Sequence, residues 1–172
     1  MAFGGDTAES FYDEGLTASM KGDVATAMEL FEKAIRLDNT MASAYHQLGK
    51  CYQRQGRFDK AVALLKQVVS NKPDNITARL DLGFALLGLG DVDEDRRQFT
   101  QVAELDPTQG KAQLGLAQAF FREGNWRGAL EQAQIALLNA GSSFAVLFLL
   151  GKSAKLSGDA TVAENNLKKA DA

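Results

Sequence analysis

Histidine and cysteine, the residue types that titrate or react most readily near neutral pH, are scarce in this chain. It contains one histidine, His46, and one cysteine, Cys51. An imidazole titrates near neutral pH and a thiolate is a strong nucleophile, so together they could form a catalytic pair. They are five residues apart, whereas residues three or four apart share a helix face, so His46 is not placed to activate Cys51. We interpret Cys51 as a small buried residue. His46 is either a contact to a bound ligand or an incidental residue on a helix face.

A second candidate is an acidic cluster formed by Asp91, Asp93, Glu94 and Asp95. Closely spaced carboxylates could suggest a calcium site, but the run lacks the spacing and the central glycine of an EF-hand loop. Carboxylates also stabilise the N-terminal end of a helix through its dipole. We therefore predict that this cluster begins a helix.

No other pattern in the sequence indicates catalysis. There is no glycine-rich phosphate loop, no pair of carboxylates in a pocket-like context and no nucleophile beside a base. A single cysteine excludes an internal disulfide and a cysteine-rich metal site. We expect a protein that is not an enzyme and that needs no cofactor or metal.

Composition and charge limit the classes of partner and the cellular compartments that we expect for this chain. The 172 residues carry a formal net charge of −3, which does not favour binding to nucleic acid. The longest apolar run, from Phe144 to Leu150, is far shorter than the roughly 18 residues that indicate a membrane span. The first ten residues lack the basic start and apolar core of a secretory signal. We expect a cytoplasmic protein, with the periplasm or another compartment after signal removal as the alternative.

The elements that would position these side chains repeat along the chain. Glycines recur every 34 residues at Gly22, Gly56, Gly90, Gly124 and Gly158, and a second series consists of Gly15, Gly49, Gly83 and Gly151. A fixed period of this length is typical of helical repeat arrays, in which each unit is a pair of helices. We predict a flexible leader at residues 1–7 and one array over 8–172, with units at 8–41, 42–75, 76–109, 110–143 and 144–172.

The second unit carries the clearest motif. It contains, in order, Tyr45, Leu48, Gly49, Tyr52, Ala61, Leu65 and Pro73. This series of an aromatic residue, Leu-Gly, Tyr, Ala, an aromatic or Leu, and Pro resembles the tetratricopeptide repeat family, over residues 8–172. The resemblance implies an all-α fold, a right-handed α-solenoid of antiparallel helix pairs. Arg79 and Gln113 depart from the pattern by replacing the first aromatic residue. Asp95 also departs from it, because the equivalent residues are Ala27, Ala61, Ala129 and Ala163.

The resemblance also implies a binding surface. In such arrays the first helix of each pair lines a concave groove, through the second, fifth, sixth, ninth, twelfth and thirteenth positions of the unit. At these positions the basic residues outnumber the acidic ones, although the whole chain is acidic, and an apolar band crosses three adjacent units. The candidate partner-binding residues are His46, Lys50, Arg54, Leu80, Phe84, Leu87, Lys111, Leu114, Phe121, Arg122, Phe148, Lys152 and Lys155.

We therefore hypothesise a non-catalytic scaffold or adaptor that holds a peptide segment of a partner protein in this groove. A basic, partly apolar groove favours a peptide with apolar anchors and with acidic residues or a free carboxylate. A chaperone-type carboxylate clamp is disfavoured, because only Lys111 suits that role and Asp81 would repel a carboxylate. The alternatives are a self-assembling homo-oligomeric scaffold and a fragment of a larger protein, either an enzyme or a secretion or assembly factor.

Overall fold

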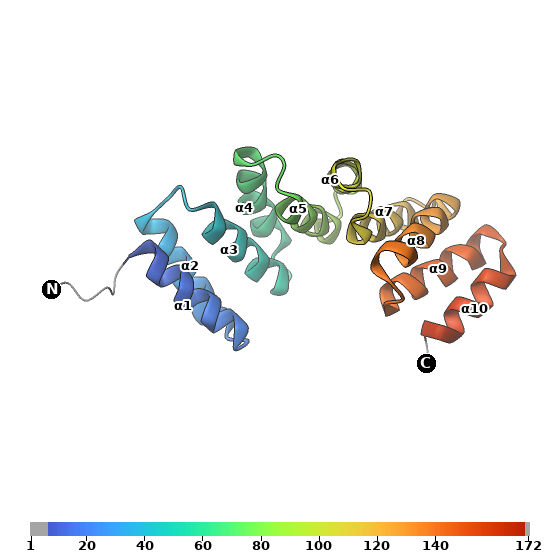
Figure 1. Cartoon of the computed structure of the whole chain (residues 1–172), viewed down its shortest axis with the longest axis horizontal. Coiled ribbons are helices and arrows are strands. Elements are labelled where there is room, and N and C mark those ends of the chain that lie inside the picture. The colour runs from blue at the N-terminus through green and yellow to red at the C-terminus, as the bar shows by residue number, and fades with distance from the viewer. Residues whose placement is uncertain (1–6, 171–172) are drawn as a thin grey trace. The chain divides into compact units, whose positions relative to one another are not determined.

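The computed structural model describes residues 7–170, which form ten α-helices, eight of which pack as four pairs of consecutive helices (Figure 1). No strand occurs among these residues, which confirms the all-α prediction. The helices are α1 (Ala8–Met20), α2 (Val24–Leu37), α3 (Ala42–Arg54), α4 (Phe58–Asn71), α5 (Ile76–Leu89), α6 (Val92–Leu105), α7 (Gly110–Arg122), α8 (Trp126–Ala140), α9 (Phe144–Ser157) and α10 (Ala160–Ala170).

The described chain divides into two compact units between Ala85 and Leu86, within α5. We call them the N-terminal unit and the C-terminal unit and describe each by itself. Most of the leader predicted at residues 1–7 lies outside the described residues. Thr7 is described, and its side chain caps α1 by accepting a hydrogen bond from the Ser10 backbone N–H at 3.1 Å.

The first glycine series closes the turn inside each helix pair. All five of its members have positive φ, for example 70° at Gly56 and 93° at Gly158. An L-residue with a Cβ is strained in this region, whereas glycine is not. The strict 34-residue interval therefore reflects one backbone conformation required once in every pair.

The second glycine series allows the two helices of a pair to approach closely. A Cβ built on Gly49 would lie 2.9 Å from Leu65 Cγ, and one on Gly15 would lie 2.7 Å from the Phe31 ring. The partner residues Leu65 and Phe31 are themselves fully buried. Close packing of this kind forms the core between paired helices, because interiors leave little room for an added carbon.

The acidic cluster begins α6, as predicted. Asp91 is the N-cap, and its carboxylate accepts a hydrogen bond from the Glu94 backbone N–H at 3.4 Å. Asp93 forms an ion pair with Arg96 at 3.5 Å across one turn of the helix. The Asp91 carboxylate thus accepts a hydrogen bond from a free N–H group of the first turn, and the negative charges offset the positive end of the helix dipole. The two carboxylates do not surround a cation.

The two departures from the aromatic pattern have a structural role. Arg79 Nε donates a hydrogen bond to the Pro73 carbonyl oxygen at 3.1 Å, and Gln113 Nε2 donates one to the Pro107 carbonyl oxygen at 3.2 Å. Each proline lies in the turn that leaves the preceding helix pair. A polar side chain at this position therefore joins each of these turns to the helix that follows it by donating to a backbone carbonyl of the turn.

Candidate functional site

The C-terminal unit contains two adjoining cavities, which share Phe121 of α7 and Phe148 of α9. Their volumes are about 260 Å³ and about 410 Å³. We call the combined surface the α7–α9 groove. Its lining residues are Leu87, Gln118, Phe121, Arg122, Phe148, Leu149, Lys152, Lys155 and Leu156.

Phe121 is held in place by its neighbours in the core. Its ring packs edge-on against Trp126 at the start of α8, with 5.0 Å between centroids and an interplanar angle of 64°. It also packs against a buried cluster that includes Ala133 and Leu149. This contact geometry is favourable for two aromatic rings, so Phe121 forms a rigid wall of the groove.

Phe148 presents apolar surface to solvent. It is 40% exposed, and it stacks on Phe144, which is 64% exposed, with 5.7 Å between ring centroids. Lys152 Nζ lies 5.5 Å from the Phe148 centroid. These residues follow one another at four-residue intervals and so share one face of α9. Adjacent exposed aromatic rings of this kind indicate an interaction surface more strongly than a single exposed residue does.

The groove is positively charged. Arg122, Lys152 and Lys155 are among its lining residues, and none of the lining residues of the two cavities is acidic. The Arg122 guanidinium donates a hydrogen bond to the Leu87 backbone carbonyl, which holds its side chain at the groove wall. Cations beside an apolar surface attract an anionic ligand and limit the orientations in which it can bind.

The structure brings together six of the candidate binding residues in the C-terminal unit: Leu87, Phe121, Arg122, Phe148, Lys152 and Lys155. Leu114 is partly buried against the core cluster, and Lys111 is exposed outside the two cavities. The candidate set omitted Gln118, Leu149 and Leu156, which occupy groove-facing positions of their units. Their spacing along the helices was the signal that could have included them.

In the N-terminal unit the candidate residues are arranged differently. His46 Nε2 lies 2.7 Å from Asp81 Oδ2, so these two side chains bind each other. Lys50 and Arg54 line a cavity of only about 30 Å³, which has room for about one water molecule. Leu80 is only 6% exposed and therefore contributes to packing rather than to an open surface. The last candidate, Phe84, is partly buried.

Cys51 is buried, as the sequence predicts. It is 2% exposed, and burial raises the pKa of its thiol, although the nearby charges of Arg54 and Lys50 oppose that rise. A thiol with a raised pKa forms little thiolate at neutral pH. Its environment therefore does not make it a reactive nucleophile.

Asp95 is a buried titratable residue, and its burial was not predicted from the sequence. It is fully buried at the start of α6, and neither carboxylate oxygen has a hydrogen-bond partner among the described residues. Burial raises the pKa of Asp95 to about 6, against the opposing positive charge of Arg122. Alanine at the equivalent position of the other four repeats was the signal that this carboxyl is unusual. Because Arg122 also lines the α7–α9 groove, the groove lies near a buried titratable group.

No group of three or more His, Cys, Asp or Glu side chains among the described residues could hold a metal ion. Within the same residues, no helix has both the length and the apolar character needed to cross a membrane.

Comparison with known proteins decides the family. Two family models described as tetratricopeptide repeat match this sequence, one at residues 18–75 and 54–94 and the other at residues 114–170. The chain is a tetratricopeptide repeat protein. Members of this family generally mediate protein–protein interactions.

Solved structures of repeat proteins share the fold along nearly the whole chain. MamA from Desulfovibrio magneticus RS-1 is 18% identical, with a TM-score of 0.86 over 96% of this chain and 94% of that one. YrrB, described as a tetratricopeptide repeat protein with an unusual peptide-binding site, is 19% identical, with a TM-score of 0.76 over 96% of this chain and 85% of that one. At this level of identity the likeness shows the helical repeat fold alone.

A curated relative is much longer. Heat shock protein STI1 of Saccharomyces cerevisiae is 33% identical over 113 residues, which make up 65% of this chain and 19% of that protein. The chain spans less than a fifth of the length of the curated relatives that it matches. The similarity therefore concerns a repeat array within larger proteins.

Proposed function

We propose that this chain is a non-catalytic interaction module and that its α7–α9 groove binds a peptide segment of a partner protein. The peptide carries an apolar or aromatic side chain flanked by acidic residues.

The observation that carries the proposal is the combination of apolar walls and unopposed cations. Phe121, Phe148 and Leu156 supply apolar surface, while Lys152 and Lys155 lie at the same cavity. An apolar anchor that leaves water to enter this groove is stabilised by roughly 25 cal/mol for each Å² of buried apolar surface. Carboxylates on either side of the anchor would then face the lysines, which favours one binding orientation.

The size of the groove suits an anchor of one or two side chains. The cavity of about 410 Å³ lies at the lower end of the range found for ligand-binding sites, and the cavity of about 260 Å³ lies just below that range. They share the Phe121 and Phe148 rings, so two neighbouring side chains of a peptide could contact both rings. We therefore expect binding to depend on a short motif rather than on a long segment.

The test is a peptide-display selection against the purified chain, followed by titration of the selected peptides by fluorescence anisotropy. We expect enrichment of an aromatic or large aliphatic residue with neighbouring Asp or Glu. Phe148→Ala should weaken binding by about tenfold, the scale of an interface anchor residue. Lys152→Glu should also weaken binding. Its effect should increase as the salt concentration falls, because the repulsion between the introduced glutamate and the acidic peptide is then less screened.

Leu138→Ala is the matched control for loss of exposed apolar surface. Leu138 is 83% exposed on α8 and does not line the groove, so this variant should bind like the parent. Selected peptides without acidic residues, or equal affinity for the Phe148→Ala and Leu138→Ala variants, would contradict the proposal. Circular dichroism melts of each variant would separate loss of binding from loss of fold.

A further inference from the structure

Asp95 is a buried carboxyl group without the partners that usually accompany a buried charge. It lies in the first turn of α6 and is fully buried. Neither of its carboxylate oxygens accepts a hydrogen bond of normal geometry from the described residues. Burial without such partners disfavours the charged form, so this carboxyl binds a proton more readily than an exposed one does.

Packing between α6 and α7 brings Asp95 close to Arg122, a residue of the α7–α9 groove. Arg96, which follows Asp95, forms an ion pair with Glu123, which follows Arg122. The distance between Arg96 Nη1 and Glu123 Oε1 is 3.0 Å. The start of α6 and the end of α7 are therefore in contact, and the charge of Arg122 acts on the Asp95 carboxyl.

Arg122 also acts on the groove. It lines the cavity of about 260 Å³ with Phe121 and Phe148, and its guanidinium donates a hydrogen bond to the Leu87 backbone carbonyl. When an acidic peptide is bound, this cation interacts with two carboxyl groups, that of Asp95 and that of the peptide. Two carboxylates near one cation repel each other, and the repulsion disfavours the state in which both are ionised.

Several groups determine how readily Asp95 ionises. Burial has the largest effect and raises the pKa of Asp95 to about 6. The positive charge of Arg122 and the nearby Arg96 backbone N–H lower this pKa, whereas the negative charges of Glu123, after α7, and Asp91, at the start of α6, raise it. The part of α5 within the C-terminal unit contains no titratable side chain. A peptide carboxylate beside Arg122 would act in the same direction as Glu123 and Asp91.

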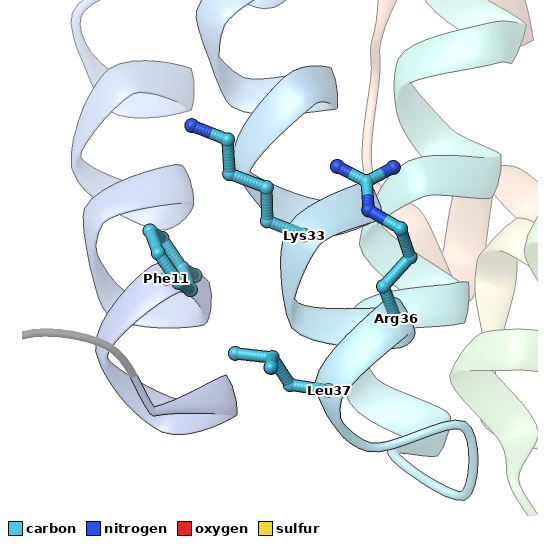
Figure 2. A pocket seen from close by; sticks show the side chains of 4 residues that line it. All are labelled: Phe11, Lys33, Arg36 and Leu37. Carbon is cyan, nitrogen blue, oxygen red and sulfur yellow. The ribbon is translucent and has the colours of Figure 1, made fainter.

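The cavity of the first helix pair has cations but no such carboxyl. Lys33 and Arg36 of α2 line this cavity together with Phe11 and Leu37 (Figure 2). Among residues 7–170, Asp95 is the only acidic side chain that is buried. A cavity cation beside a buried carboxyl group is therefore particular to the C-terminal unit.

We propose that the α7–α9 groove is a proton-coupled site, in which protonation of Asp95 strengthens the binding of an acidic peptide. When Asp95 is ionised, Arg122 is shared between two carboxylates. When Asp95 takes up a proton from solvent, the charge of Arg122 is fully available to the peptide. Linkage requires the reverse effect as well, so a bound acidic peptide increases the affinity of Asp95 for its proton. This inference rests on the proposed function of the groove and adds its regulation by pH.

The probe is a rhodamine-labelled, amidated peptide with a central Phe-Leu pair flanked on each side by Asp and Glu. Fluorescence anisotropy measures its affinity for the full chain at about pH 5.5 and about pH 7.5. The peptide carboxylates stay largely ionised at both values, because their pKa values are about 4. Coupling between two sites is commonly about fivefold or more. Since Asp95 is only partly protonated at the lower pH, we expect binding there to be about threefold tighter or more.

Two variants remove the titration of Asp95. Asp95→Asn has the shape of the protonated acid and should bind at both pH values about as tightly as the parent does at low pH. Asp95→Ala introduces the residue of the other four repeats, and it should also lose the pH dependence if the amide disturbs the core. Asp93→Asn is the matched control, because the Asp93 side chain is 96% exposed in the same helical turn. This control should keep the pH dependence of the parent.

The proton coupling and the proposed function fail on different results. Equal affinity of the parent at the two pH values would overturn the coupling and leave the groove as the peptide site. A pH dependence that persists in both Asp95 variants would also overturn it, because His46 and the other titratable groups remain in them. Absence of binding by the parent and every variant at both pH values would overturn both proposals.

The reciprocal effect of the peptide on Asp95 is measured by ¹³C NMR titration of the Asp95 carboxyl carbon. Its midpoint should move to higher pH when the peptide is bound. The midpoint should not move with a peptide that has Asn and Gln in place of Asp and Glu. An unmoved midpoint with the acidic peptide would contradict the coupling. Thermal melts at both pH values would show whether each variant remains folded.

Discussion

His46 Nε2 lies 2.7 Å from Asp81 Oδ2, and these two partly buried side chains join α3 to α5 within the N-terminal unit. The pair gives the only histidine of the chain a structural partner. It also explains how an acidic residue is accommodated on a face where basic residues predominate. His46 was a candidate for contact with a ligand, and its bond to Asp81 leaves its imidazole less available for that contact.

The first prediction concerns this pair. His46→Ala and Asp81→Asn should each lower the free energy of unfolding by about 1 kcal/mol, the usual scale for a partly buried hydrogen bond. The double variant should lose less than the sum of the two, because the interaction can be removed only once. Urea denaturation of the four proteins measures the coupling. Strict additivity would show that the contact contributes nothing to stability.

The second prediction concerns the pH dependence caused by Asp95. Its pKa is raised from 3.8 to about 6, so the folded state binds this proton more tightly than the unfolded state does. This contribution to stability is fully present below about pH 4 and is lost as the pH rises through 6. Two units correspond to about 2–3 kcal/mol. Asp95→Ala should therefore be more stable than the parent at pH 7.5 and lose this advantage near pH 4.5.

Urea denaturation of parent and variant at the two pH values would measure the effect of Asp95. Asp93→Ala is the control, because the Asp93 side chain is 96% exposed in the same helical turn. An Asp95→Ala variant whose stability relative to the parent does not change between the two pH values would show that Asp95 is ionised throughout.

The third prediction links Arg122 to Asp95. The charge of Arg122 lowers the pKa of Asp95 and so partly offsets the effect of burial. Arg122→Gln should raise that pKa further, which a ¹³C NMR titration of the Asp95 carboxyl carbon would detect directly. The same variant should bind acidic peptides more weakly, since Arg122 lines the α7–α9 groove. An unchanged titration curve would mean that Arg122 is too well solvated to affect Asp95.

The fourth prediction tests the close packing at Gly115. A Cβ at this position would lie 2.4 Å from the Phe99 ring, which is fully buried between α6 and α7. Gly115→Ala should destabilise the chain by about 1–3 kcal/mol, the usual cost of overpacking a core. Phe99→Leu in the same chain should restore part of the loss, because it removes ring atoms near the new methyl group. Failure of this second substitution to relieve any of the loss would place the strain in the backbone.

Much of the fold follows from local sequence. The turn glycines need positive φ, which depends only on the backbone around Gly22, Gly56 and their equivalents. The cluster at Asp91 begins α6 because carboxylates bind N–H groups within the next turn. These effects act over a few residues, and a fixed period repeats them, so the helix pairs and the all-α repeat fold could be predicted from the sequence.

Which candidate side chains are exposed or paired depends on contacts between helices of different repeats. The sequence of a single repeat does not reveal these contacts. His46 and Asp81 are 35 residues apart, and their pairing requires α3 and α5 to lie at a particular distance. Leu80 and Phe148 were both expected on the groove surface, yet one is 6% and the other 40% exposed. Exposure is decided by which neighbouring helices cover a side chain. The sequence by itself therefore determined the repeat unit and its family, while only the tertiary structure decided which side chains are paired, buried or left open for a partner.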